Sequence, residues 1–204
     1  MSVELVDYRR RVFEQYRQAR EARDAEPAVR QWREERDQLF HEHPQSPLDA
    51  EQKQTFQSLS YFPYNSQWRK LARLDYEVDE GEIEVQLRDD GVLRMRPLAI
   101  AHWQHENLPF QLTLYSISGY GGGLFLPFRD LSHNSGKVYA GTRYLLDTIK
   151  GADFGMQGEQ LVLDFNYAYN PSCAYNADWD CPLAPQQNWL ELEVLAGEKL
   201  YPPQ

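Results

Sequence analysis

The sequence predicts a mainly β, α+β protein in which an antiparallel β-barrel or sandwich follows a group of N-terminal helices. Apolar residues recur every three or four positions in the first 60 residues, and they alternate with polar residues from about Trp68 onward. No helical pattern separates the later strands, which favours antiparallel pairing over a parallel sheet. At 204 residues and 42% hydrophobic content, the chain is long enough for one core. We therefore expect a helical arm, residues 1–60, and a β domain, residues 61–204, that fold as one cooperative unit.

The arm is predicted to hold three helices. The first has an apolar stripe at helical spacing, formed by Leu5, Tyr8, Val12, Tyr16 and Ala19. The second follows Pro27 and should end before Pro44. Its apolar side is formed by Val29, Trp32, Leu39 and Phe40. A third, short helix is expected to start with Ser46 as its N-cap, Pro47 at the first helical position and Asp49 in the first turn.

The strands are predicted from alternation of apolar and polar residues. Residues 82–88 alternate as in a half-buried strand. The turn at residues 89–91 ends in a glycine that can adopt a positive φ, so the chain should return antiparallel from Val92. Later inward rows are expected at Phe110, Leu112 and Leu114, at Leu161, Leu163 and Phe165, and at Leu190, Leu192 and Val194.

Charge and cysteine content narrow the class of partners. The 31 acidic and 21 basic residues give a net charge of -10, which repels nucleic acids and anionic membranes.

No apolar run approaches the roughly 20 residues that cross a bilayer, and the first residues lack the pattern of a secretion signal. We expect a cytoplasmic protein without a cofactor, whose two cysteines are thiols, although a bridge between Cys173 and Cys181 is sterically allowed.

The candidate site lies in residues 164–181, DFNYAYNPSCAYNADWDC, which gather Asp, Asn and Tyr side chains with both cysteines around one proline. If the preceding strand continues past Asp164, then Asp164 and Asn166 share the face opposite Leu163. Such a polar pair facing an interior needs partners. We expect Arg143 to pair with Asp164, since guanidinium and carboxylate tolerate burial together. Alternation alone leaves open that this face is solvated.

Several sequence segments together carry a resemblance to a known family. They are LSYFPYNSQWR, LFLPFRD, GTRYLLD, DFNYAYNPSCAY and CPLAPQQNWLELEVLAGE, in that order. In these segments the chain resembles the bacterial and archaeal family DUF1684, a domain of unknown function. The resemblance spans from about Trp32 to Lys199. Because no activity is assigned to that family, the resemblance implies no reaction.

Familiar chemical motifs do not fit this sequence. The GYGGG segment lacks the Lys and hydroxyl residue of a phosphate loop, and there is no GxSxG, HExxH or EF-hand pattern. Zinc is not expected, because the available ligands lack the close paired spacing of structural sites. Those ligands are His102, His105, Cys173 and Cys181. Glycoside hydrolysis needs two carboxyl groups at a set distance from each other. Asp130, Asp147 and Asp164 are candidates, but the sequence does not give the distances between them.

We prefer the hypothesis of a small-molecule-binding barrel that recognises a polar or aromatic ligand such as a sugar, nucleoside or aromatic acid. Flat walls would come from Tyr169 and Tyr175, joined by Trp179 or Trp189. The groups that fix the polar parts of the ligand would be Arg143, Asp164, Asn166 and Asn170.

Two alternatives remain open. In the first, the protein is a hydrolase in which Cys173 or Asp164 reacts and Arg143 stabilises negative charge. In the second, the segment is a rigid structural loop in which Asn166 and Asn170 satisfy backbone groups. The first helix would cover the barrel mouth, cap a sheet edge or mediate self-association, so the oligomeric state is open.

Overall fold

The computed structural model describes residues 2–87, 91–119 and 121–201. Within these residues the helices are α1 (Glu4–Glu21), α2 (Ala25–Glu42) and α3 (Ala50–Thr55). The strands that follow are β1 (Arg69–Asp75), β2 (Ile83–Gln86), β3 (Val92–His105), β4 (Leu108–Ile117), β5 (Gly123–Asp130), β6 (Arg143–Asp147), β7 (Met156–Gln157), β8 (Gln160–Asp164) and β9 (Trp189–Leu190). None of the helices in these ranges has the length and apolar character that crossing a membrane requires.

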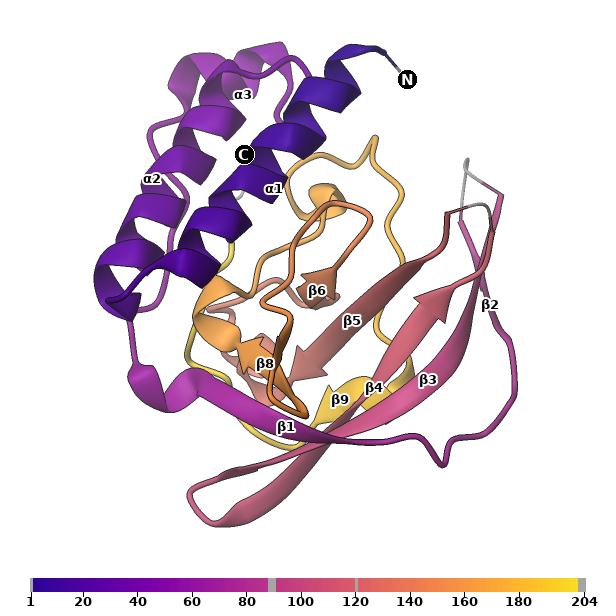
Figure 1. Cartoon of the computed structure of the whole chain (residues 1–204). Coiled ribbons are helices and arrows are strands. Elements are labelled where there is room, and N and C mark those ends of the chain that lie inside the picture. The colour runs from indigo at the N-terminus through magenta and orange to yellow at the C-terminus, as the bar shows by residue number, and fades with distance from the viewer. Residues whose placement is uncertain (1, 88–90, 120, 202–204) are drawn as a thin grey trace.

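The strands form one curled sheet rather than two stacked sheets (Figure 1). Its order is β6-β5-β4-β3-β1-β8-β7, with β2 beside β3 and β9 beside β5. Every strand pair is antiparallel except the short pair of β5 with β9. Tyr144 of β6 and Tyr169, just after β8, exchange two backbone hydrogen bonds of 2.8 and 3.0 Å. This bridge joins the two ends of the sheet, and the predicted mainly β, antiparallel fold with N-terminal helices is confirmed.

The sheet is buried on both faces. One hydrophobic cluster includes Leu112, Leu163 and Phe165, together with Leu190, Val194 and Ala196 from the last part of the chain. The other lies between the sheet and the helices and includes Tyr16 of α1 and Trp32 of α2. Strand β8 contributes to both clusters, with Leu161 and Leu163 in one and Val162 in the other. The helical arm therefore covers one face of the sheet and contributes Tyr16, Val29 and Trp32 to the second cluster.

The helices largely follow the sequence pattern, with errors at the starts of the second and third. Helix α2 ends before Pro44, as predicted, but starts two residues before Pro27 rather than after it. The N-cap of α3 is Asp49 rather than Ser46. The Asp49 carboxylate accepts a hydrogen bond from the Gln52 backbone at 2.8 Å, and the Gln52 side chain accepts one from the Asp49 N–H at 2.8 Å. Because this reciprocal pair satisfies two free N–H groups, the helix starts after Asp49.

The strands agree with the alternation except at the end of the chain. Strands β2 and β3 pair antiparallel as predicted, with Gly91 at φ +81°. Residues 89 and 90 of the predicted turn, and residue 88 of the predicted strand, lie outside the described residues. Of the last predicted row, only Leu190 lies in a strand, and β9 runs parallel to β5. The row still faces the core without a long ladder, because Leu190 and Val194 are buried and Leu192 is partly buried against the same cluster.

Candidate functional site

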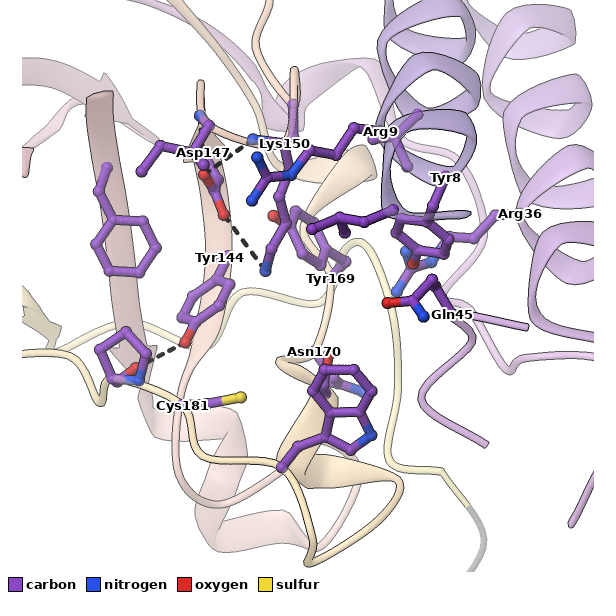
Figure 2. A pocket seen from close by; sticks show the side chains of 18 of the residues that line it. Tyr8, Arg9, Arg36, Gln45, Tyr144, Asp147, Lys150, Tyr169, Asn170 and Cys181 are labelled. Atoms are coloured by element: carbon purple, nitrogen blue, oxygen red, sulfur yellow. Dashed lines mark hydrogen bonds and ion pairs between the residues drawn. The ribbon is translucent and has the colours of Figure 1, made fainter. Parts of the chain in front are cut away.

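A pocket of about 730 Å³ lies between the helical arm and the curled sheet (Figure 2). Its volume falls within the range of small-molecule sites, which is about 300–1,000 Å³. Helix α1 lines it with Leu5, Tyr8, Arg9, Val12 and Tyr16, and α2 with Trp32, Arg36 and Phe40. The β domain contributes Phe125, Tyr144, Asp147, Lys150, Tyr169, Asn170, Tyr175, Trp179 and Cys181. Most of these side chains are aromatic or aliphatic, so the pocket is apolar with a few polar groups.

The pocket exists because the apolar stripe of α1 is longer than the core that it covers. Tyr16, near the end of the helix, is 2% exposed and packs edge-on against Trp32 and Phe154 at centroid distances of 5.9 and 5.7 Å. Leu5 and Val12, earlier in the stripe, are only half-buried, because they face the pocket. The first part of α1 therefore forms a wall rather than part of a packed core.

A buried ion pair lies on the α2 side of the pocket. Arg36 of α2 donates to the Glu198 carboxylate at 3.1 Å and to the Tyr175 hydroxyl at 3.2 Å. The Tyr175 hydroxyl also donates to Glu198. The Arg36 guanidinium lies over the rings of Phe40 and Tyr169, 4.6 and 5.1 Å from their centroids. Its charge is thus compensated by a carboxylate and by ring faces, as a buried cation requires.

The opposite side carries a second polar group. The Lys150 ammonium lies 3.4 Å from the Asp147 carboxylate, and the Tyr144 hydroxyl donates to the Pro182 carbonyl at 2.8 Å. Figure 2 shows Arg9 of α1 reaching toward the Asp147 and Lys150 side of the pocket. Arg9 is exposed and Lys150 is half-buried, so both cations are accessible to solvent. Positive side chains therefore lie at the rim, and aromatic rings lie further in.

Four buried polar atoms of lining residues have no hydrogen-bond partner among the described residues. They are the hydroxyl oxygens of Tyr16 and Tyr169, Oδ1 of Asn170 and Nε of Arg36. A buried polar atom without a partner is destabilising and rare in folded proteins.

The two cysteines lie side by side at this pocket. Both are free and half-buried, and Cys181 is among the lining residues. The Cys173 N–H donates to the Cys181 sulfur at 3.4 Å, and the Tyr139 hydroxyl lies 3.7 Å from the Cys173 sulfur. The hydrogen bond from the Cys173 thiol lowers the pKa of Cys181 to about 7, with help from backbone N–H groups and Lys150. The same contact raises the pKa of Cys173. The more acidic thiol is therefore Cys181 and not Cys173, the residue chosen from the sequence.

The predicted pairing of Arg143 with Asp164 is wrong. Arg143 bonds to the Asp130 carboxylate and to the carbonyls of Val194 and Ala196 at 2.9 and 2.7 Å. Asp164 instead meets Arg69 of β1 at 3.2 Å. These contacts hold strand β6 to the end of the chain and β8 to β1. Neither Arg143 nor Asp164 lines the pocket.

The predicted common face of Asp164 and Asn166 is also wrong. Strand β8 ends at Asp164, and residues Phe165–Tyr167 form a 3₁₀ turn. The Asp164 carboxylate caps this turn by accepting from the Asn166 N–H at 3.1 Å and from its side chain at 2.9 Å. The Asn166 amide then exchanges two hydrogen bonds with the Asn65 backbone. Asp164 thus satisfies a local backbone group, whereas the Asn166 side chain satisfies the backbone of the distant Asn65 rather than that of its own turn.

Other predicted residues do meet at the pocket. Tyr169, Asn170, Tyr175 and Trp179 line it, whereas Trp189 lies under the Arg129 guanidinium at 4.6 Å from the ring centroid and does not. The sequence analysis missed the α1 and α2 residues, because a helical stripe is the usual sign of core packing. It also missed Lys150, for which no local pattern exists, and it considered Cys181 only as a bridge partner or a zinc ligand. The described residues contain no cluster of three or more His, Cys, Asp or Glu side chains that could hold a metal.

Comparison with known proteins places the chain in a family. Residues 54–199 match the family model described as "Protein of unknown function (DUF1684)". The chain belongs to the DUF1684 family. The fold of this DUF1684 protein is similar to the solution NMR structure of an uncharacterised protein of Haloarcula marismortui, with a TM-score of 0.61 and 32% sequence identity. The match covers 85% of this chain and 93% of the other. No curated protein matches the chain.

The two comparisons differ at the helical arm. The family match begins at residue 54, after α1 and α2. The structural match covers 85% of the chain, which is more than residues 54–204 contain, so it includes part of the arm. Part of the arm of this DUF1684 protein therefore has a counterpart in the haloarchaeal protein.

Proposed function

We propose that this DUF1684 protein binds a small organic ligand in the pocket between α1, α2 and the curled sheet. The observation that carries the proposal is the pocket itself, about 730 Å³ in volume and walled mainly by aromatic and aliphatic side chains. Sites of this size with few polar groups bury most of the surface of a small ligand. A fully packed protein has few voids of this size, because interiors reach the density of organic crystals.

The lining chemistry favours a ligand with a flat apolar body. The rings of Tyr8, Trp32, Phe125, Tyr144 and Tyr169 come from both the arm and the sheet, so they can contact both faces of such a body. The cations Arg9 and Lys150 at the rim can hydrogen-bond an anionic substituent. An aromatic or unsaturated acid fits this combination better than a sugar, whose many hydroxyl groups need more partners.

Two measurements test the proposal. Native mass spectrometry of the protein as purified should show a copurified organic molecule, or, if none is retained, aromatic acids should raise the melting temperature in a panel with nucleosides and sugars. Saturable quenching of tryptophan fluorescence by the active compound would then give its affinity. If no compound of the three classes is retained, shifts the melting temperature or changes the fluorescence, the proposal is wrong.

A matched pair of variants in α1 localises the binding. Val12→Trp places a large ring in the pocket, because Val12 lines it, and should abolish the melting shift. Val6→Trp makes the same change at a side chain that is 59% exposed and outside the lining, and should retain the shift. Equal binding by both folded variants would place the ligand elsewhere.

A further inference from the structure

We propose that Cys181 and Cys173 form a peroxide-reactive dithiol, in which Cys181 is oxidised first and Cys173 then closes a disulfide within the chain. The proposal goes beyond ligand binding and needs no ligand in the pocket. It starts from the position of the two thiols. Cys181 is half-buried and lines the pocket, so a small solute can reach its sulfur. Figure 2 shows that sulfur directed from the wall toward the interior.

The contacts around Cys181 stabilise a thiolate. The N–H of Cys173 donates to its sulfur at 3.4 Å, and the Cys173 thiol hydrogen-bonds to the same atom. A backbone N–H of Ser172 and the positive charge of Lys150 act in the same direction, so the pKa of Cys181 is about 7. Since the thiolate is the nucleophile of cysteine chemistry, this lowered pKa increases the share of molecules that carry a reactive sulfur at neutral pH.

The second thiol is placed to complete the reaction. The hydrogen bond of 3.4 Å from the Cys173 N–H to the Cys181 sulfur holds the two cysteines side by side. Both residues lie in an irregular segment apart from the 3₁₀ turn Ser172–Ala174, so no strand or α-helix must break for the sulfurs to meet. The pair therefore has the arrangement of a reacting cysteine beside a resolving one.

The chemistry requires a hydroperoxide, for which hydrogen peroxide is the simplest example. The Cys181 thiolate attacks one peroxide oxygen, the O–O bond breaks, and the leaving hydroxide takes up a proton to become water. Cys181 becomes a sulfenic acid. The Cys173 sulfur then attacks the Cys181 sulfur, its proton and the sulfenic hydroxyl leave as a second water, and the S–S bond forms. Two thiols are oxidised by two electrons and one peroxide is reduced to two waters.

A disulfide between these residues would act on the pocket. The closed loop of residues 173–181 contains Trp179, which lines the pocket together with Cys181. A crosslink restricts the conformations of a loop of this length. Oxidation would thus fix one wall of the pocket, while α1 and α2 on the other side are unaffected.

The experiment uses the fully reduced, full-length protein and one equivalent of hydrogen peroxide at pH 7. The wild type should lose both thiols, its intact mass should fall by two hydrogens, and a non-reducing peptide map should link Cys173 to Cys181. The Cys173→Ser variant should stop at a sulfenic acid that dimedone traps on Cys181. The Cys181→Ser variant should leave Cys173 unreacted over the same period.

The unfolded wild type provides a control that needs no variant to fold. In guanidinium chloride both thiols return to ordinary acidity, so the native protein should react about threefold faster or more at pH 7, after allowing for the lower nucleophilicity of a more acidic thiol. Lys150→Gln should slow the native reaction, whereas Arg9→Gln, which changes another cation of the same pocket, should not. A native rate no faster than the unfolded one, a dimedone adduct on Cys173 instead of Cys181, or a link only between two chains would overturn the proposal.

Discussion

The carboxylate of Glu198 accepts a hydrogen bond from the Arg36 guanidinium at 3.1 Å, which joins helix α2 to the end of the chain inside the protein. Glu198 is 1% exposed and also accepts from the Tyr175 hydroxyl and, at 3.0 Å, from the Asn170 N–H. One carboxylate thus connects the helical arm, the loop after β8 and the final segment. The helical arm and the loop after β8 also line the pocket.

Replacing this carboxylate should be costly. Glu198→Gln leaves the buried Arg36 charge without its counter-ion, and we expect a loss of about 3–5 kcal/mol in the free energy of unfolding, measured by urea denaturation. Glu82→Gln is the matched control, because Glu82 pairs with Arg94 and Arg96, which are more than half exposed. Its effect should be much smaller. Similar losses for the two variants would mean that the buried ion pair is not important for stability.

Gly197, the residue before Glu198, should not tolerate a side chain. Its φ is +75°, and an added Cβ would lie 2.5 Å from the Ala168 carbonyl oxygen and 2.7 Å from that of Phe165. We expect Gly197→Ala to lower the free energy of unfolding by at least about 2 kcal/mol. Gly81→Ala places a methyl group in open space and should leave stability nearly unchanged. A stable Gly197→Ala protein would contradict the close packing of residues 165–168 against this glycine.

Asp37 should make stability fall as the pH rises. Burial raises its pKa to about 6, while the hydrogen bond from the Leu59 N–H opposes this shift. Because the folded state holds the proton more tightly than the unfolded state, the contribution of Asp37 is fully present below about pH 4. It is lost as the pH rises through about 6. Asp37→Asn should remove this part of the pH dependence of the melting temperature. A wild-type profile unchanged by the substitution would exclude Asp37 as its source.

Two substitutions of Tyr16 distinguish the contribution of its ring to stability from that of its hydroxyl. The ring packs against Trp32 and Phe154, and the hydroxyl has no partner among the described residues. Tyr16→Ala should cost about 3–5 kcal/mol, as for other large aromatic residues in cores. Tyr16→Phe should be neutral or slightly stabilising, because it removes an unpaired polar group. A large loss for Tyr16→Phe, seen in a melting curve, would show that the hydroxyl has a bound partner in solution.

The fold was predictable where a local pattern is sufficient. The stripe of α1 and the alternation in β2 and β4 agree with the structure, because side-chain period alone distinguishes helix from strand. The start of α3 was not predictable in this way. Ser46 and Asp49 are both acceptable caps, and the outcome depends on Gln52, whose side chain also donates to the distant Tyr175 carbonyl at 2.7 Å.

The candidate site was predicted only in part, for similar reasons. The period-two argument extended β8 beyond Asp164, although an Asp two residues before an Asn is itself a local signal for a capped turn. Several acidic residues could in principle pair with Arg143. The sequence alone does not show that its partner is Asp130 on the neighbouring strand β5. Lys150 and Cys181 line the same pocket only because the sheet curls, and no local pattern in the sequence contains that information.

The pairing of β1 with β8 affects how the protein is made. Arg69 lies opposite Asp164, so almost a hundred residues separate two neighbouring strands. Folding of such remote pairs is slow, because a long loop must close before the contacts form. During synthesis the helical arm leaves the ribosome first, and β8 leaves near the end. The apolar side of the arm therefore stays uncovered for most of translation, and a chaperone that shields α1 and α2 should increase the yield of folded protein.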